Sequence, residues 1–196
     1  MLLTAEKRQG VMTDLGEQME VPRCYTTALA DGTRVSKTDA RIVACGELDE
    51  LGAHIGAVCA ALHKLMETAV PKQAEVLQQM RMRLYDVQRN LFAIGARVVG
   101  AQTRAACDWA KATAVLTADI AQWRQCGIRF GGFVLPTGSQ TACSVHICRT
   151  VCRRAERSVV VLQDRDSVEY LNVLSKYLFH LALFINHVEG VDEIIL

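Results

Sequence analysis

Only three prolines interrupt this chain of 196 residues, at positions 22, 71 and 136. Proline ends or kinks a helix, so long segments without it are free to be helical. Apolar residues in these segments recur about every three to four positions, the period of a helix with one buried face. Long helices with short connections pack as an antiparallel bundle, so we expect an all-α, antiparallel five-helix bundle. The predicted helices cover about residues 39–63, 71–98, 111–125, 140–162 and 167–187.

The ends of the last predicted helix have recognisable signals. Asp166 or Ser167 is expected to cap its start, with Glu169 placed to close a capping box. Gly190 is expected to stop it, because glycine readily adopts the left-handed conformation that ends many helices. The one segment with a strand-like pattern covers residues 130–135.

The length suits one domain with a substantial core. The first residues are acidic and lack the apolar centre of a signal peptide. We therefore expect residues 1–24 to form a flexible tail and residues 25–196 one helical domain. A net charge of +1 gives no overall field to attract nucleic acid, and no apolar run approaches the roughly 20 residues of a membrane span. We expect no nucleic-acid or membrane partner, and a cytoplasmic location or, in a eukaryote, the mitochondrial matrix.

The chain has eight cysteines, an even number that is compatible with disulfides. Most of them fall in helical segments, and a chain this large and apolar needs no crosslinks, so we expect free thiols in the core. Cys148 and Cys152 lie one turn apart, but no second pair of histidines or cysteines has the spacing of a metal site. The sequence thus predicts no metal site made of protein ligands alone.

A row of arginines is the strongest chemical signal. Arg149, Arg153 and Arg157 are four residues apart and stack on one helix face, while Arg154 points off this face. Like charges at this spacing repel by about 0.2–0.5 kcal/mol per pair, so the row favours a bound anion. Guanidinium groups bind phosphate oxygens in bidentate fashion, which makes a polyphosphate the natural partner. The alternative is a solvated basic face with Asp49 and Glu156 as acidic partners.

Two further segments are candidates for the same site. Residues 25–37 are polar and rich in turn residues, and their hydroxyls and Lys37 can cradle phosphates, although the glycine spacing of a Walker loop is absent. Asp49 lies at the edge of an apolar helix face, where a half-buried carboxylate needs a cation such as Arg149; the alternative is a surface acid. Asn172 and Lys176 are one turn apart and can point into one pocket.

These residues resemble the PduO-type ATP:cob(I)alamin adenosyltransferases. The similarity spans about residues 26–186, and its most specific part is Cys-Arg-Arg-Ala-Glu-Arg at 152–157. The matching motifs in chain order are Arg34–Lys37, Gly46–Leu51, Val87–Ala96, Phe133–Ser139, His146–Arg157 and Tyr170–Phe179.

The resemblance implies a fold, an activity and partners. The family fold is a five-helix bundle that forms homotrimers with active sites between subunits. Cob(II)alamin is held without its lower axial ligand and reduced, and cob(I)alamin then takes the 5′-deoxyadenosyl group of ATP, bound with Mg²⁺, releasing triphosphate. Beside ATP and cobalamin, a cob(II)alamin reductase or a B12-dependent mutase is an expected partner.

The resemblance also assigns roles to residues. Phe133 is expected to occupy the lower face of cobalamin and Arg153 to act on the triphosphate, while Asp49 and Arg149 form a salt bridge between subunits. The ATP-binding residues that it implies are Thr26, Thr27, Lys37, Arg153, Glu156, Arg157 and Asn172.

Two departures from the family pattern favour an alternative function. The family loop reads Gly-Asp-x-Gly before a Thr-Thr pair, whereas residues 22–25 here are Pro-Arg-Cys-Tyr, or most of the loop is deleted. Lys176 stands where the family has an aspartate. The alternative is a catalytically weak family member that binds cobalamin or nucleotide as a carrier, partner or sensor.

Overall fold

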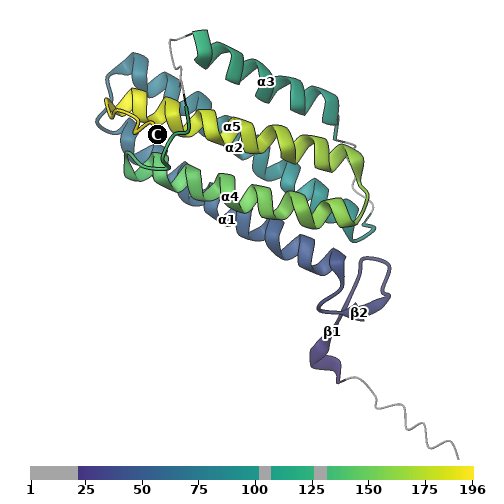
Figure 1. The fold of residues 1–196 in the computed structure, drawn as a ribbon. Coiled ribbons are helices and arrows are strands. Elements are labelled where there is room, and N and C mark those ends of the chain that lie inside the picture. The colour runs from purple at the N-terminus through teal and green to yellow at the C-terminus, as the bar shows by residue number, and fades with distance from the viewer. Residues whose placement is uncertain (1–21, 102–106, 126–131) are drawn as a thin grey trace, which may run out of the picture.

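The computed structural model describes residues 22–101, 107–125 and 132–196, and within them it has the five predicted helices (Figure 1). The predicted tail, residues 1–24, falls mostly outside these ranges; its last residues enter a short 3₁₀ helix, Arg23–Tyr25. The helices are α1 Ala40–Met66, α2 Pro71–Val98, α3 Trp109–Gln125, α4 Gln140–Val161 and α5 Arg165–Glu189. The expected all-α bundle is confirmed, and the predicted bounds of α2 agree with the structure.

Helix α5 lies at the centre of the bundle. It packs against α4 on one side and α3 on the other, and α1 packs against both α4 and α2. The apolar residues that recur along α5, such as Leu171, Leu178 and Ile185, are fully buried. By length and composition, α5 is also apolar enough to cross a membrane, contrary to the sequence expectation, but 67% of that apolar window is buried inside the protein. This burial is typical of a core helix.

The start of α5 differs from the prediction. Asp164 is the N-cap, and its carboxylate accepts hydrogen bonds from the backbone N–H and the hydroxyl of Ser167. Glu169 closes no capping box, because its carboxylate accepts from Arg165 at 2.9 Å instead. The helix ends as predicted: Gly190 has φ of +68° and caps the last turn. Three acidic or hydroxyl residues within four positions made the cap ambiguous from sequence.

A two-stranded hairpin precedes the bundle and was not predicted. Strand β1, Thr26–Ala28, pairs antiparallel with β2, Arg34–Ser36. Three-residue strands are too short for a clear period-two pattern, so the sequence suggested only a polar, turn-rich segment. Of the segment 130–135, which has the strand-like pattern, residues 130 and 131 lie outside the described residues, and Val134 forms a single bridge with Ile195.

The described cysteines are free, as the sequence predicted, and Cys126 lies outside the described residues. Their expected place in the core holds for Cys59, Cys148 and Cys152, whereas Cys24 is exposed and the other described cysteines are half-buried. Burial raises the pKa of the Cys59 thiol to about 11 and that of Cys148 to about 12. The Cys152 thiol donates to the backbone oxygen of Leu171 at 3.4 Å. These thiols therefore behave as small apolar side chains that join α4 to its neighbours.

Candidate functional site

The arginines of α4 divide into two kinds. Arg154 is neutralised by two carboxylates of α1: it donates to Glu50, and Glu47 lies 3.7 Å from its Nε. Ser158 donates to the same Glu47 at 2.7 Å. Arg154 lies off the main row, as its spacing predicted, and it connects α4 to α1.

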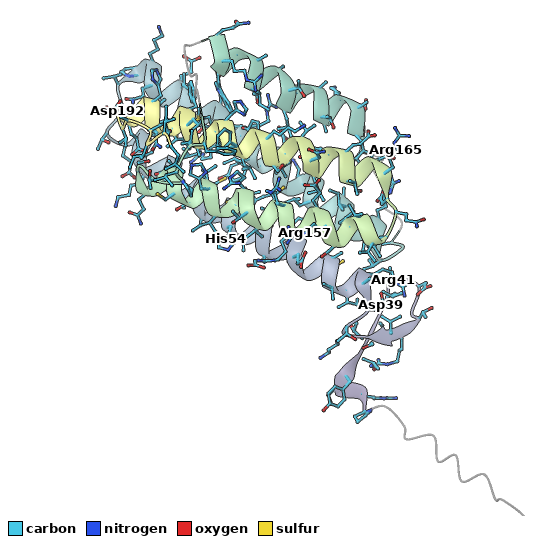
Figure 2. All side chains as sticks on the ribbon, in the orientation of Figure 1. Asp39, Arg41, His54, Arg157, Arg165 and Asp192 are labelled. Atoms are coloured by element: carbon cyan, nitrogen blue, oxygen red, sulfur yellow. The ribbon has the colours of Figure 1, made fainter. Side chains whose placement is uncertain are left out.

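Arg153 and Arg157 are exposed on another face of α4, and Figure 2 marks Arg157 there. Within the described part of the chain neither makes an ion pair, and the guanidinium of Arg157 donates only to the backbone oxygen of Arg153, at 3.2 Å. Glu156, between them, is half-buried and makes no ion pair with either. The reading of this row as a basic face balanced by Asp49 and Glu156 therefore finds no support within one chain.

Arg149 is half-buried, and its Nε atom has no hydrogen-bond partner among the described residues. Burial and the neighbouring Arg153 charge lower the pKa of Arg149 from its usual value. One turn away, His146 is buried with both ring nitrogens unpartnered in the same described set, and burial lowers its pKa to about 4. Polar atoms this buried normally have partners, so this face of α4 has polar groups that the described residues leave unpartnered.

Asp49 does not meet Arg149 within the chain. It is exposed, rather than half-buried as the sequence suggested, and it borders a small hollow with Gln88 and Phe92 of α2. The reason is the phase of α1: Leu48 and Leu51 face the core, and Asp49 turns toward α2 while Glu47 and Glu50 meet α4. A pair between Asp49 and Arg149 requires a second chain.

Asn172 and Lys176 are exposed one turn apart on α5. The Cys152–Leu171 contact places the helix turn of Asn172 beside that of Arg153. The Asn172 side chain makes no hydrogen bond to these arginines among the described residues, so a site that joins them stays a prediction. Lys176 adds a further cation on the same helix.

The hairpin lies beyond the bundle. In Figure 1 it projects from the start of α1, away from the helices. The Thr26 hydroxyl accepts from Arg34 Nε at 3.1 Å and is therefore engaged inside the hairpin, whereas the side chains of Thr27 and Lys37 make no hydrogen bond or ion pair among the described residues. Arg34 was not predicted as a site residue; the strand register pairs it with Ala28, and its guanidinium reaches Thr26, two residues away on the same strand as Ala28.

Phe133 lies at the opposite end of the molecule, just before α4. Its side chain is 84% exposed, which excludes the role of a core phenylalanine. The two ends, marked by Asp39 and Asp192 in Figure 2, are separated by the length of α4, about 33 Å for 22 residues. One chain therefore does not bring Phe133 together with Lys37, Thr26 and Thr27.

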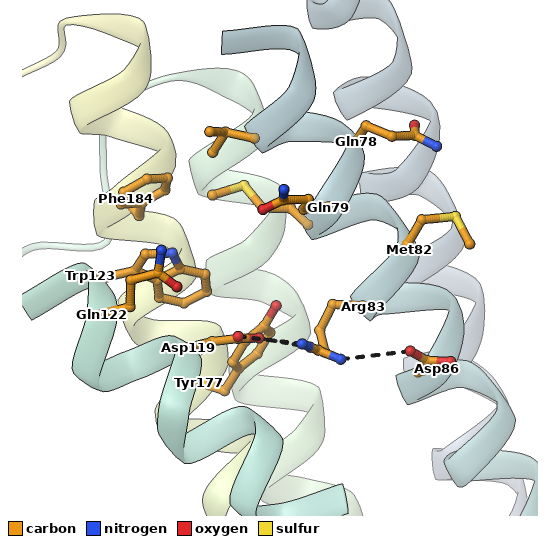
Figure 3. A pocket seen from close by; sticks show the side chains of 12 residues that line it. Gln78, Gln79, Met82, Arg83, Asp86, Asp119, Gln122, Trp123, Tyr177 and Phe184 are labelled. Carbon is orange, nitrogen blue, oxygen red and sulfur yellow. Dashed lines mark hydrogen bonds and ion pairs between the residues drawn. The ribbon is translucent and has the colours of Figure 1, made fainter. Parts of the chain in front are cut away.

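A cavity of 440 Å³ lies between α2, α3 and α5 and includes none of the predicted site residues (Figure 3). Arg83 lies in it, with its Nε 2.7 Å from Asp119 and its Nη1 3.7 Å from Asp86. The cation of this cavity is thus already balanced, unlike Arg153 and Arg157. No sequence pattern indicated this cavity, because its residues come from three separate helices.

Comparison with known proteins identifies related sequences and folds. The family described as cobalamin adenosyltransferase matches residues 25–185. A cobalamin adenosyltransferase of Cupriavidus metallidurans is 37% identical over 177 residues, covering 87% of this chain and 88% of the relative. Corrinoid adenosyltransferase MMAB of Bos taurus is 34% identical and covers 89% of this chain and 76% of its own.

Solved structures extend this similarity to the fold. A variant of the PduO-type ATP:corrinoid adenosyltransferase from Lactobacillus reuteri, complexed with cobalamin and ATP, has a TM-score of 0.74 and 26% sequence identity. The match covers 88% of this chain and 94% of that one. A second variant, complexed with ATP, has a TM-score of 0.72.

Proposed function

We infer the activity of this chain from its family: it belongs to the cobalamin adenosyltransferases, whose match covers residues 25–185. It is an enzyme that transfers the 5′-deoxyadenosyl group of ATP to the cobalt of cob(I)alamin, giving adenosylcobalamin and triphosphate. Relatives at 37% and 34% identity have this activity in their names, and a structural neighbour is bound to both cobalamin and ATP.

The unneutralised pair Arg153 and Arg157 is the observation that best supports a location for ATP, and we assign Asn172 on the neighbouring helix to the same site. Attack of Co(I) on C5′ of ATP breaks the C5′–O bond, and the electron pair leaves with triphosphate. Two guanidinium groups already in place stabilise that developing charge without reorganisation. We assign Glu156 and Lys37 as further ATP-binding groups, and Mg²⁺ as the ion that accompanies the phosphates.

We assign Phe133 to the lower face of cobalamin. A ring that is 84% exposed gains little from its present surroundings, so its outward position favours contact with a ligand. An aromatic ring at this face excludes water and the cobalamin base from cobalt. Without that lower ligand, Co(II) is easier to reduce to the nucleophilic Co(I).

The separation of the site residues supports a homotrimer with sites between subunits. The Phe133 loop precedes α4 and the hairpin precedes α1, at opposite ends of the bundle, so we infer that a neighbouring chain completes the site. Exposed Asp49 and the unpartnered Nε of Arg149 are complementary, and we assign them to an ion pair across the interface. Breaking such a pair from one side costs roughly 3–5 kcal/mol when it is buried.

Electron supply and product delivery imply protein partners. Cob(I)alamin requires a one-electron donor acting on cob(II)alamin, and adenosylcobalamin is consumed by B12-dependent enzymes. We therefore propose a cob(II)alamin reductase or a B12-dependent mutase as partner. A second candidate function is that of a carrier or sensor with weak catalysis. Two observations favour it: Lys176 lies one turn from Asn172, and the hairpin has only residues 29–33 between its strands.

Anaerobic incubation of the protein with cob(I)alamin, ATP and Mg²⁺ tests the activity. Formation of the cobalt–carbon bond is followed by the change in cobalamin absorbance, with boiled protein and ATP-free mixtures as controls. A parallel titration measures ATP binding alone. Turnover supports the adenosyltransferase, whereas ATP or cobalamin binding without turnover favours the carrier or sensor.

A further inference from the structure

The backbone, rather than side-chain packing, fixes the position of Phe133. Its carbonyl accepts from the N–H of Leu196 at 2.8 Å, and the N–H of Leu135 donates to the carbonyl of Ile194 at 2.9 Å. These two hydrogen bonds flank the bridge between Val134 and Ile195. The residues on either side of this bridge thus tie the Phe133 loop to segment 192–196.

The amide of Asn186 holds the other half of the loop. This residue of α5 is fully buried, and its Oδ1 accepts from the N–H of Ser139 at 2.9 Å. Its Nδ2 donates to the carbonyl of Thr137 at 3.2 Å and to Glu193 Oε1 at 2.9 Å. One side chain therefore joins the loop, the first turn of α4 and segment 192–196.

The loop passes close enough to Asn186 that only glycine fits at position 138. Gly138 has φ of +114°, which side chains rarely allow, and an added Cβ would lie 2.2 Å from the Asn186 amide nitrogen. This close approach lets Thr137 and Ser139, on either side, both reach the same amide. The contact is local in space and joins residues 47 to 49 positions apart in sequence.

We propose that Asn186 and segment 192–196 form a latch that positions Phe133 for the reaction, with Asn186 as a positioning residue. The proposal rests on the assignment of Phe133 to the lower face of cobalamin. A ring that blocks an axial position works only if it is held to within a fraction of an ångström, and an exposed loop residue has no packing to hold it. The latch supplies that restraint through the backbone.

The first test removes one hydrogen bond without altering the core. Leu196 is 77% exposed, so Leu196→Ala keeps its N–H and serves as the control, while Leu196→Pro deletes the donor to Phe133. We expect kcat to fall roughly three- to tenfold in Leu196→Pro relative to Leu196→Ala, the factor for one lost hydrogen bond. KM for ATP should stay within about twofold, because none of the residues assigned to ATP lies in the Phe133 loop or in segment 192–196.

The second test reverses the polarity of the latch. Asn186→Asp keeps the acceptor for Ser139 but places a carboxylate against the Thr137 carbonyl and Glu193. We expect a loss of kcat larger than in Leu196→Pro, with partial recovery in Asn186→Asp/Glu193→Gln, where the new amide can donate. Asn90→Asp is the control, because the Asn90 amide also donates inside the protein, to Tyr170 at 3.1 Å, but far from the loop.

Two readouts separate positioning from plain stability. Hydrogen exchange at the Leu135 amide reports the loop directly, and we expect faster exchange in Leu196→Pro and Asn186→Asp than in their controls. The paramagnetic resonance spectrum of bound cob(II)alamin reports the lower ligand, and we expect it to shift toward that of free cob(II)alamin in the same two variants. A merely structural change would lower the melting temperature and leave this spectrum of the folded protein unchanged.

The outcomes distinguish the latch from the function on which it depends. Unchanged Leu135 exchange in both variants, or faster exchange with unaltered kcat and cobalt spectrum, would overturn the latch. If Phe133→Ala reacts like the unmodified protein, the assignment of Phe133 fails, while the exchange data still test whether the loop is held. No adenosylation by the unmodified protein would refute the proposed function instead. If Asn186→Asp does not fold, the Leu196 pair alone decides.

Discussion

Arg154 donates a hydrogen bond to the carboxylate of Glu50 and thereby ties α4 to α1. Arg153, the preceding residue, is exposed and makes no ion pair within the described chain. Adjacent arginines thus have different tasks: one connects two helices, and the other is available to an anion. This contrast can be tested directly.

Arg153→Ala should weaken ATP binding about tenfold or more, because a charge-assisted hydrogen bond to phosphate contributes about 1.5–3 kcal/mol. Arg154→Ala is the matched control and should leave ATP affinity unchanged. Its pair is partly exposed, 41% for Arg154 and 45% for Glu50, so its loss should lower stability by only about 0.2–1 kcal/mol. Calorimetric titration with ATP and chemical denaturation measure the two effects. Equal ATP affinities in the two variants would show that Arg153 is a solvated surface residue that does not bind ATP.

The protein should be a trimer with three times the chain mass of 21.6 kDa. Arg149→Ala and Asp49→Ala should each weaken that assembly, and the double variant should be no weaker than the worse single one, because both remove the same ion pair. Sedimentation equilibrium over a range of micromolar concentrations measures the assembly. A monomer for the unmodified chain, or fully additive effects, would refute the intersubunit pair.

Phe133→Ala should reduce the adenosylation rate steeply and leave ATP affinity and the trimer nearly intact. Because the ring is 84% exposed, its removal should change stability by less than about 0.5 kcal/mol, whereas a core phenylalanine would cost about 3–5 kcal/mol. Melting temperature and initial rate are measured on the same preparation. An undiminished rate in stable protein would count against the cobalamin contact.

Gly138→Ala should destabilise the protein by more than about 2 kcal/mol, because it combines a positive φ of +114° with an overlap against the Asn186 amide. Gly46→Ala is the control: this helical glycine has nothing within 4 Å of an added Cβ, so alanine should be neutral or stabilise α1 by about 0.5–1 kcal/mol. Urea denaturation of both variants gives the comparison. Similar midpoints would show that the loop relaxes around position 138.

Stability should fall as the pH decreases through the range set by His146. Burial lowers its pKa to about 4 in the folded chain, below the value of about 6.5 expected when unfolded. Between these values the unfolded chain binds the extra proton, so stability is lost as pH falls from about 6.5 to 4, by at most about 3 kcal/mol. His146→Leu should flatten this slope in denaturation measurements, while His63→Leu, at an exposed position, should preserve it.

The bundle could be predicted from sequence because its information is local. Apolar residues at helical spacing, such as Leu171, Leu178 and Ile185, define a buried face whatever the partner helix is, and all three are buried in α5. Pro71 and Gly190 marked helix ends because their backbone restrictions act within one turn. The arginine row was predictable for the same reason, since a four-residue spacing alone stacks Arg153 and Arg157.

The tertiary structure decided which charges are balanced and which residues meet. Three features depend on how separate helices pack: Glu50 neutralises Arg154, Asp49 is exposed, and Asn186 holds the Phe133 loop. The contacts of Asn186 and Arg154 join residues 47 and 104 positions apart in the sequence. No local sequence pattern predicts contacts between residues so far apart in the sequence, because many helix orientations bury the same apolar faces equally well. The amino-acid sequence therefore determined the helices and the chemistry available on each, and packing alone determined which of those groups remain free for ATP and cobalamin.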